Sequence, residues 1–142
     1  MGIERIFLAD DEATAALGAR LAATLKPGDT VLLIGDLGAG KTSLARAVIR
    51  TLVGDADVDI PSPSFALVQP YETPTGVPIV HADLYRISDP REVDELGLFD
   101  RPQAIVLIEW PEKARDLLSD DVVSVTLSIP ETRLGRVAEI DR

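Results

Sequence analysis

Residues 35–42 read Gly-Asp-Leu-Gly-Ala-Gly-Lys-Thr, and the interpretation of the whole chain depends on this octapeptide. It fits the pattern GxxxxGK[ST] at every fixed position, a match expected by chance in about one or two scrambled sequences per thousand. Glycines at positions 38 and 40 let the main chain wrap an anion where a Cβ atom would collide. Lys41 can reach terminal phosphates, and the Thr42 hydroxyl can ligate Mg²⁺. The octapeptide therefore predicts a phosphate-binding loop; the alternative is a glycine-rich turn whose lysine has no ligand.

The residues on either side of the loop supply the context that such a loop needs. Thr30 to Ile34 is a continuous apolar run of strand length, which is typical of a strand covered on both faces. After the loop, one helical face collects the apolar residues Leu44, Ala45, Val48, Ile49 and Leu52. A strand, a glycine loop and a helix in this order bring main-chain N–H groups and the positive end of the helix dipole to one point.

Short apolar runs alternate with turns along the rest of the chain. We expect strands at 3–8, 65–71, 77–85, 104–108, 122–129 and 134–140, and helices at 10–25, 89–97 and 111–118. Thr73-Pro74-Thr75-Gly76 predicts a hairpin turn, and residues 54–64 a loop. Buried parallel strands beside hairpin-linked strands indicate an α/β fold with a mixed sheet flanked by helices.

Length and composition narrow the possible functions. With 142 residues, we expect a single domain spanning 1–142. The chain has 14 Lys and Arg residues against 24 Asp and Glu, a net charge of −10, which opposes nucleic acid or an anionic membrane as a direct ligand. It has no cysteine, which excludes disulfides, thiolate metal sites and cysteine nucleophiles. The longest apolar run is far shorter than a membrane span, and no secretory signal is evident, so we expect a cytoplasmic protein.

A Mg²⁺ ion held by phosphates and one hydroxyl also needs a carboxylate, usually at the tip of an apolar strand. Glu109 ends the run from Ala104 to Ile108, and Asp83 follows another apolar run; Glu109 is the favoured metal ligand. Either acid could instead be an ordinary strand-end residue that meets solvent. His81, the single histidine, shares a sheet face with Asp83 because strand side chains alternate, but a lone histidine is more often a packed core residue.

Three further features bear on the site, and the first two of them each have two interpretations. Trp110, the single tryptophan, lies near the nucleotide or simply packs in the core. Ser62 and Ser64 belong to a mobile loop that faces the phosphates or to a plain linker. In the C-terminal segment, Arg133 or Arg136 is a candidate to approach the nucleotide.

Taken together and in order, four motifs resemble one known family. They are the glycine loop with Lys41-Thr42-Ser43, then Ser62-Pro63-Ser64-Phe65, then His81-Ala82-Asp83-Leu84-Tyr85-Arg86, then Ile108-Glu109-Trp110-Pro111-Glu112. Their order and spacing resemble the TsaE family of bacterial tRNA threonylcarbamoyladenosine biosynthesis ATPases, over roughly residues 10 to 118. The chain departs from the family in having Ser43 and Ser64 where members usually have threonine, which keeps the hydroxyl.

The resemblance implies a P-loop NTPase fold with a mixed, mostly parallel central sheet. It implies a cytoplasmic ATPase that joins TsaD and TsaB and supports threonylcarbamoyl transfer to adenosine 37 of certain tRNAs, touching tRNA only indirectly. Carried over by position, Gly38, Ala39, Gly40, Lys41, Thr42 and Ser43 would hold the ATP phosphates. Thr42 and Glu109 would hold Mg²⁺. Asp83 would act with Lys41 in hydrolysis.

Rival functions make different demands on the sequence. A small-molecule kinase needs an acceptor pocket and usually a lid with several arginines, for which so short a chain has little room. A GTP-driven switch usually recognises guanine through an Asn-Lys-x-Asp motif, and this sequence has no asparagine. Asp94-Glu95-Leu96-Gly97 nevertheless matches the DxxG pattern of such switches. A binding module with a fixed, structural nucleotide is the remaining alternative. For the ATPase we expect slow intrinsic turnover, because no residue stands out as an arginine finger.

Overall fold

The computed structural model describes residues 2–64, 66–118 and 121–142. The elements follow in the order β1 (Ile3–Leu8), α1 (Asp11–Thr24), β2 (Thr30–Ile34), α2 (Lys41–Val53), β3 (Val68–Glu72), β4 (Pro78–Asp83), α3 (Arg91–Glu95), β5 (Ile105–Glu109), the 3₁₀ helix η1 (Pro111–Leu117), β6 (Val123–Ser128) and β7 (Arg136–Asp141). Among the described residues, no helix is both long and apolar enough to cross a bilayer.

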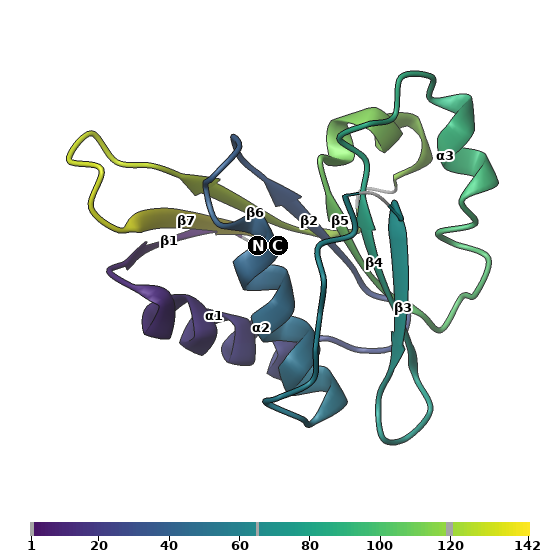
Figure 1. The fold of residues 1–142 in the computed structure, drawn as a ribbon, viewed down its shortest axis with the longest axis horizontal. Helices are drawn as coiled ribbons and strands as arrows, with labels where there is room; N and C mark the ends of the chain where they lie inside the picture. The colour runs from purple at the N-terminus through teal and green to yellow at the C-terminus, as the bar shows by residue number, and fades with distance from the viewer. Residues whose placement is uncertain (1, 65, 119–120) are drawn as a thin grey trace.

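The described strands form one seven-stranded mixed sheet in the order β1-β7-β6-β2-β5-β4-β3 (Figure 1). The four central strands, β6, β2, β5 and β4, run parallel to one another. Antiparallel pairing is confined to the two margins, where β3 joins β4 and where β7 and β1 extend from β6. The expected mixed sheet with a parallel centre is confirmed. Because parallel strands all end at one edge, the carboxyl ends of β2, β4 and β5 meet there.

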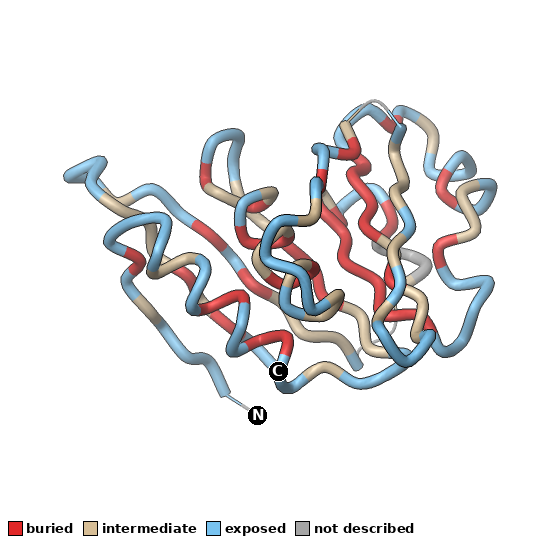
Figure 2. The backbone as a smooth tube through the Cα atoms, turned by 60° about the horizontal axis from the view of Figure 1, so that its bottom comes forward, coloured by how far each residue is buried: buried red, intermediate tan, exposed pale blue. Residues whose placement is uncertain are grey.

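Helices cover both faces of the central strands, and side-chain alternation divides the core accordingly. On β2, Val31 and Leu33 pack in a cluster with residues of α1 and α2, whereas Leu32 points into a second cluster near α3 and η1. On β5, Leu107 faces α2, and Val106 faces the second cluster. Figure 2 shows the buried stretches concentrated in the central strands. The continuous apolar runs of the sequence therefore correspond to strands buried on both faces.

The helix predicted over 10–25 is observed as α1, which is capped by an aspartate and packs closely against α2. The Asp10 side chain accepts a hydrogen bond from the Ala13 N–H at 2.9 Å and so caps the helix. Gly18 lies so close to α2 that an added Cβ atom would come within 2.4 Å of the Ala47 Cβ. The absence of a side chain at Gly18 thus lets the two helices approach closely.

Several element boundaries differ from those expected. The strand predicted from residue 65 starts at Val68. Leu67 turns the chain before it, because its φ angle is +68° and its N–H donates to the main-chain oxygen of Pro63. Phe65 lies outside the described residues. The strand predicted to run to 85 ends at Asp83, whose carboxylate accepts the Tyr85 N–H and starts a turn. The hairpin turn at 73–76 is confirmed by the bond from the Thr73 N–H to the Val77 oxygen.

The helices after β4 are shorter or tighter than expected. The helix predicted over 89–97 is reduced to α3, with Pro90 as its N-cap. The segment predicted as a helix over 111–118 is a 3₁₀ helix with a kink at Ala114. Strand β5 extends one residue beyond its apolar run and includes Glu109, so this carboxylate is part of the sheet itself.

Candidate functional site

Residues 35–40 connect β2 to α2 as a loop with three glycines at positive φ. Gly35, Gly38 and Gly40 have φ angles of +154°, +82° and +102°. A Cβ atom added at Gly38 or Gly40 would meet no heavy atom within 4 Å, so both glycines border open space. Because Gly40 is the N-cap of α2 and has no side chain, no side chain caps the first N–H groups of that helix. The loop and the helix start therefore form an open, electropositive cradle.

A cavity of about 280 Å³ lies at this cradle. Its described lining comprises Leu37, Gly38, Gly40, Lys41, Thr42, Ser43, Ser64, Asp83, Glu109 and Trp110. Five of the six predicted phosphate-binding residues are in this lining. The sixth, Ala39, is buried in the core, and its N–H donates to the Asp36 oxygen within the loop.

Lys41 is folded back onto the loop that precedes it. The residue is 5% exposed, and Nζ donates to the main-chain oxygens of Gly35 and Asp36, at 3.0 Å for Asp36. Nζ also lies 4.1 Å from the centroid of the Trp110 ring, a cation–π contact. Burial lowers the pKa of the Lys41 ammonium below its usual value, and the nearby Glu109 carboxylate opposes this effect. The ammonium is thus held beside the cavity by partners that carry no net charge, two main-chain oxygens and an indole ring.

The Thr42 hydroxyl and the Glu109 carboxylate meet at the carboxyl edge of the sheet. Thr42 Oγ1 donates to Glu109 Oε1 at 2.8 Å. Glu109 is 2% exposed, and its other oxygen, Oε2, lies 2.7 Å from His81 Nε2. A hydroxyl and a carboxylate oxygen are hard donors that suit Mg²⁺, and two of them leave positions for phosphate oxygens and water, which Mg²⁺ usually retains. The donor set therefore fits the predicted metal.

Asp83 lies beside Glu109 because β4 and β5 are parallel neighbours in register at this pair. The Asp83 side chain is 6% exposed; Oδ1 accepts the Tyr85 N–H at 2.9 Å, and Oδ2 accepts the Ser64 hydroxyl at 3.2 Å. Ser62 and Ser64 hydroxyls are 2.8 Å apart. Of the two interpretations of this serine segment, the one in which it faces the phosphate cavity is supported.

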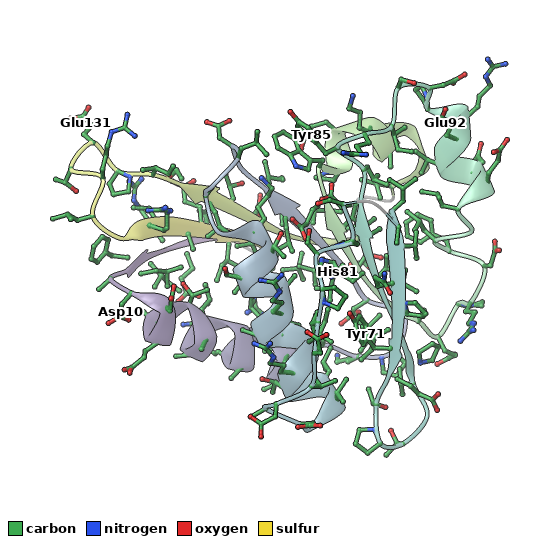
Figure 3. The ribbon with its side chains drawn as sticks, in the orientation of Figure 1. Asp10, Tyr71, His81, Tyr85, Glu92 and Glu131 are labelled. Carbon is green, nitrogen blue, oxygen red and sulfur yellow. The ribbon has the colours of Figure 1, made fainter. Side chains whose placement is uncertain are left out.

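Trp110 is the aromatic residue in the described lining of the cavity, and its backbone conformation is unusual. Trp110 directly follows Glu109 and adopts φ +57°, a left-handed conformation that costs a bulky residue energy. Its ring packs against Tyr85, with centroids 4.8 Å apart (Tyr85 is labelled in Figure 3). The residue with this left-handed backbone is thus the tryptophan that contacts Lys41 and lines the cavity.

A second cavity of about 280 Å³ adjoins the cradle on the side of α1. Its described lining comprises Leu8, Ala9, Asp10, Asp11, Thr14, Gly38, Gly40, Ser43, Gly135 and Arg136. The Arg136 guanidinium donates through Nε and Nη2 to the Gly38 oxygen, at 3.2 and 3.0 Å. Arg133 is exposed in the turn between β6 and β7 and is not part of the described lining of either cavity.

Apart from Arg136, the residues on the α1 side of the site were not predicted from the sequence. Asp10 and Thr14 lie more than twenty positions before the loop, and Gly135 and Arg136 about one hundred after it. The sequence alone could not place Arg136 at the nucleotide, because its proximity to the loop depends on how β7 pairs with β6 and β1.

A wider groove of about 700 Å³ runs between α1 and α2 and includes Ser43 in its lining. Arg46 and Arg50 line it, and their Nε atoms donate to the main-chain oxygens of Ile60 and Val58. These arginines thus hold the loop after α2 and do not line the phosphate cavity.

Comparisons with known proteins identify the family of this chain and find a solved structure with a similar fold. The model of a family described as "Threonylcarbamoyl adenosine biosynthesis protein TsaE" matches residues 8–137. A Rickettsia felis protein named "tRNA threonylcarbamoyladenosine biosynthesis protein TsaE" is 42% identical over 125 residues, covering 87% of this chain and 72% of its own. A Haemophilus influenzae protein of the same name is 36% identical over 118 residues, covering 75% and 73%. The crystal structure of Bacillus subtilis YdiB superposes with a TM-score of 0.77 at 26% identity, covering 98% of this chain and 84% of that one.

Proposed function

We propose that this chain, which belongs to the TsaE family of threonylcarbamoyl adenosine biosynthesis proteins, binds and slowly hydrolyses Mg-ATP in that pathway. The observation that carries the proposal is the convergence of Lys41, Thr42, Asp83 and Glu109 on one cavity at the glycine loop. These residues come from three separate elements, α2, β4 and β5. They combine an anion cradle, a hard-oxygen metal site and a second carboxylate, as hydrolysis of a triphosphate requires.

The cradle binds the phosphates through main-chain N–H groups of the loop and of the first turn of α2. Lys41 lines the cavity and exchanges the Gly35 and Asp36 oxygens for phosphate oxygens. Thr42 Oγ1 and Glu109 Oε1 would hold Mg²⁺, which supplies positive charge to the phosphate oxygens when bound. The base and ribose of ATP would lie in the adjoining cavity beside Asp10, Thr14 and Arg136.

Asp83 orients the attacking water and accepts its proton as the bond between the γ-phosphorus and the bridging oxygen breaks. Its Oδ1 is fixed by the Tyr85 N–H, and Oδ2 is shared with the Ser64 hydroxyl, which can give way to water. Lys41 and the loop amides stabilise the charge that develops on the phosphoryl oxygens. None of the described residues that line this cavity is an arginine, so intrinsic turnover is slow.

We further propose that the chain works in the cytoplasm as an accessory subunit with TsaD and TsaB. A cationic group supplied by such a partner raises turnover by about 10³ to 10⁵ when it reaches the phosphates. With a net charge of −10, the chain has little electrostatic attraction for tRNA, which it meets only through its partners.

The test measures release of γ-labelled phosphate by the chain alone and with purified TsaD and TsaB. The proposal requires water as the acceptor and faster release in the complex. Transfer of label to a nucleoside or metabolite would identify a small-molecule kinase instead. Equal rates alone and in the complex would remove the partner's role.

Two variants test the site itself. Asp83→Asn keeps ATP binding and lowers hydrolysis by about 10²-fold or more, the size expected for a positioned acid–base group. Asp89→Asn is the matched control, because Asp89 pairs with Arg91 outside both cavities. If Asp83→Asn and Lys41→Ala leave both ATP consumption and tRNA modification unchanged, hydrolysis at this site is excluded, and the alternative of a binding module with a structural nucleotide is supported.

A further inference from the structure

His81 lies one layer behind the metal-binding pair. It sits in the middle of β4 and is fully buried. The residue two positions earlier, Ile79, packs against α2, whereas Val80 and Ala82 pack on the opposite face, so the His81 ring lies on the α2 side with Asp83. It does not belong to the described lining of the phosphate cavity. Any role of His81 in ligand binding must therefore act through a neighbour.

That neighbour is Glu109. Nε2 of His81 lies 2.7 Å from Oε2 of Glu109, and a carboxylate can only accept, so Nε2 carries the hydrogen. The two oxygens of Glu109 are then assigned to different donors, with Oε2 bound to His81 and Oε1 bound to Thr42. The other ring nitrogen, Nδ1, is buried and has no hydrogen-bond partner within the described part of the chain.

Of the two ring nitrogens of His81, only the one that faces Glu109 forms a described hydrogen bond. A buried histidine kept for core packing alone is expected to satisfy both ring nitrogens or to be replaced by an apolar residue. Here one hydrogen bond is made, to the carboxylate, and the second is forgone. The terminal torsion of a glutamate is soft, so a carboxylate bound at one oxygen only can rotate about it. A second donor on Oε2 removes that freedom.

We propose that His81 is a positioning residue that fixes the rotation of the Glu109 carboxylate and so presents Oε1 to the metal beside Thr42. The inference rests on the proposed binding of Mg-ATP. Donors to a metal-binding group commonly change metal affinity by about 10- to 100-fold when removed. His81 therefore governs the coupling between magnesium and nucleotide, and leaves magnesium-free nucleotide binding to the loop.

The test compares His81→Gln, His81→Asn and His81→Leu with the parent chain. Glutamine can place an amide N–H where Nε2 lies, whereas the shorter asparagine cannot reach Glu109, and leucine has no donor. For each variant, calorimetry gives the Kd of a non-hydrolysable ATP analogue with saturating Mg²⁺ and with EDTA. The ratio of the two Kd values measures the coupling, and a thermal melt confirms folding.

We expect the parent and His81→Gln to agree in this ratio within about threefold, and His81→Leu and His81→Asn to lose about tenfold or more of it. The Kd in EDTA should be the same for all four proteins. Tyr71→Phe is the matched control, because the Tyr71 hydroxyl is also buried without a described partner in the layer under α2, and its removal should leave the ratio unchanged.

The outcomes separate this inference from the proposed function. If the folded parent chain does not bind the analogue with or without magnesium, the proposed function fails. If the parent shows the coupling and folded His81→Leu retains all of it, the positioning role is overturned. Should His81→Leu fail to fold, the glutamine and asparagine variants decide, and equal coupling in both overturns the role.

Discussion

Gly35 and Gly38 belong to the same loop, but the structure predicts opposite consequences for replacing each with alanine. At Gly35 an added Cβ would lie 2.5 Å from the Leu127 main-chain oxygen and 3.2 Å from the Ala39 Cβ, with φ at +154°. At Gly38 the added atom would meet nothing within 4 Å, with φ at +82°. Gly35→Ala therefore disturbs the contact between the loop and β6, whereas Gly38→Ala places a methyl group at the space that phosphates would occupy.

The expected magnitudes follow from these distances. A left-handed conformation costs a residue with a Cβ atom about 1–2 kcal/mol. At Gly35 the collision with a main-chain oxygen adds about 1–3 kcal/mol, as for overpacking in a core. For a chain of this size 1 kcal/mol lowers the melting temperature by about 2–4 °C. We therefore expect Gly35→Ala to melt roughly 10 °C below the parent and Gly38→Ala only about 4 °C below.

Thermal melts with and without Mg-ATP measure both effects. A ligand at one hundred times its Kd stabilises the folded state by about 2.7 kcal/mol, so the parent should melt several degrees higher with saturating nucleotide. Gly38→Ala should keep most of its own stability but lose this ligand-induced rise, because its methyl group competes with the phosphates. If Gly35→Ala melts at or above Gly38→Ala, or if Gly38→Ala retains the full rise, the reasoning from loop geometry is refuted.

Three further perturbations have expected outcomes. Arg136→Ala should weaken nucleotide binding about tenfold, because the Gly38 oxygen loses its hydrogen bonds from the guanidinium. Arg136→Lys should recover part of this loss in the same binding titration. Equal affinities in the parent and both variants would contradict this role. Lys41 should titrate below 10.5 in nucleotide-free protein, because burial lowers its pKa. Between the lowered pKa and 10.5, the unfolded chain binds more protons at this lysine than the folded chain does. In that pH window the free energy of unfolding of the parent, relative to that of Lys41→Met, should therefore rise with pH. Denaturant melts measure both free energies, and a difference between the two proteins that does not change with pH would exclude the shift. Calorimetry should show that Thr42→Ser retains the magnesium dependence of nucleotide binding and that Thr42→Ala loses it. The reason is that serine keeps the hydroxyl that bonds to Glu109, whereas alanine lacks it. A similar loss in both variants would count against a hydroxyl ligand.

Local sequence patterns were enough to predict the centre of this protein. Thr30 to Ile34, the glycine loop and the apolar face of α2 are contiguous, and their chemistry depends on neighbours within a few residues. Strand alternation likewise predicted that His81 and Asp83 share a face. Boundaries were less accurate where a side chain or a kink ends an element, as at Leu67 and Asp83.

Other features depend on contacts between residues far apart in the chain, which no local pattern encodes. The pairing of Asp83 with Glu109 requires β4 and β5 to be parallel neighbours, and the hold of Arg136 on Gly38 requires β7 to return beside β6. The link from His81 to Glu109 arises from the same strand register. Residue types and spacing thus determined which groups could bind a phosphate and a metal. Packing of the sheet determined which oxygen each donor reaches, because hydrogen bonds act over about 3 Å and a one-residue slip in register turns a side chain to the opposite face.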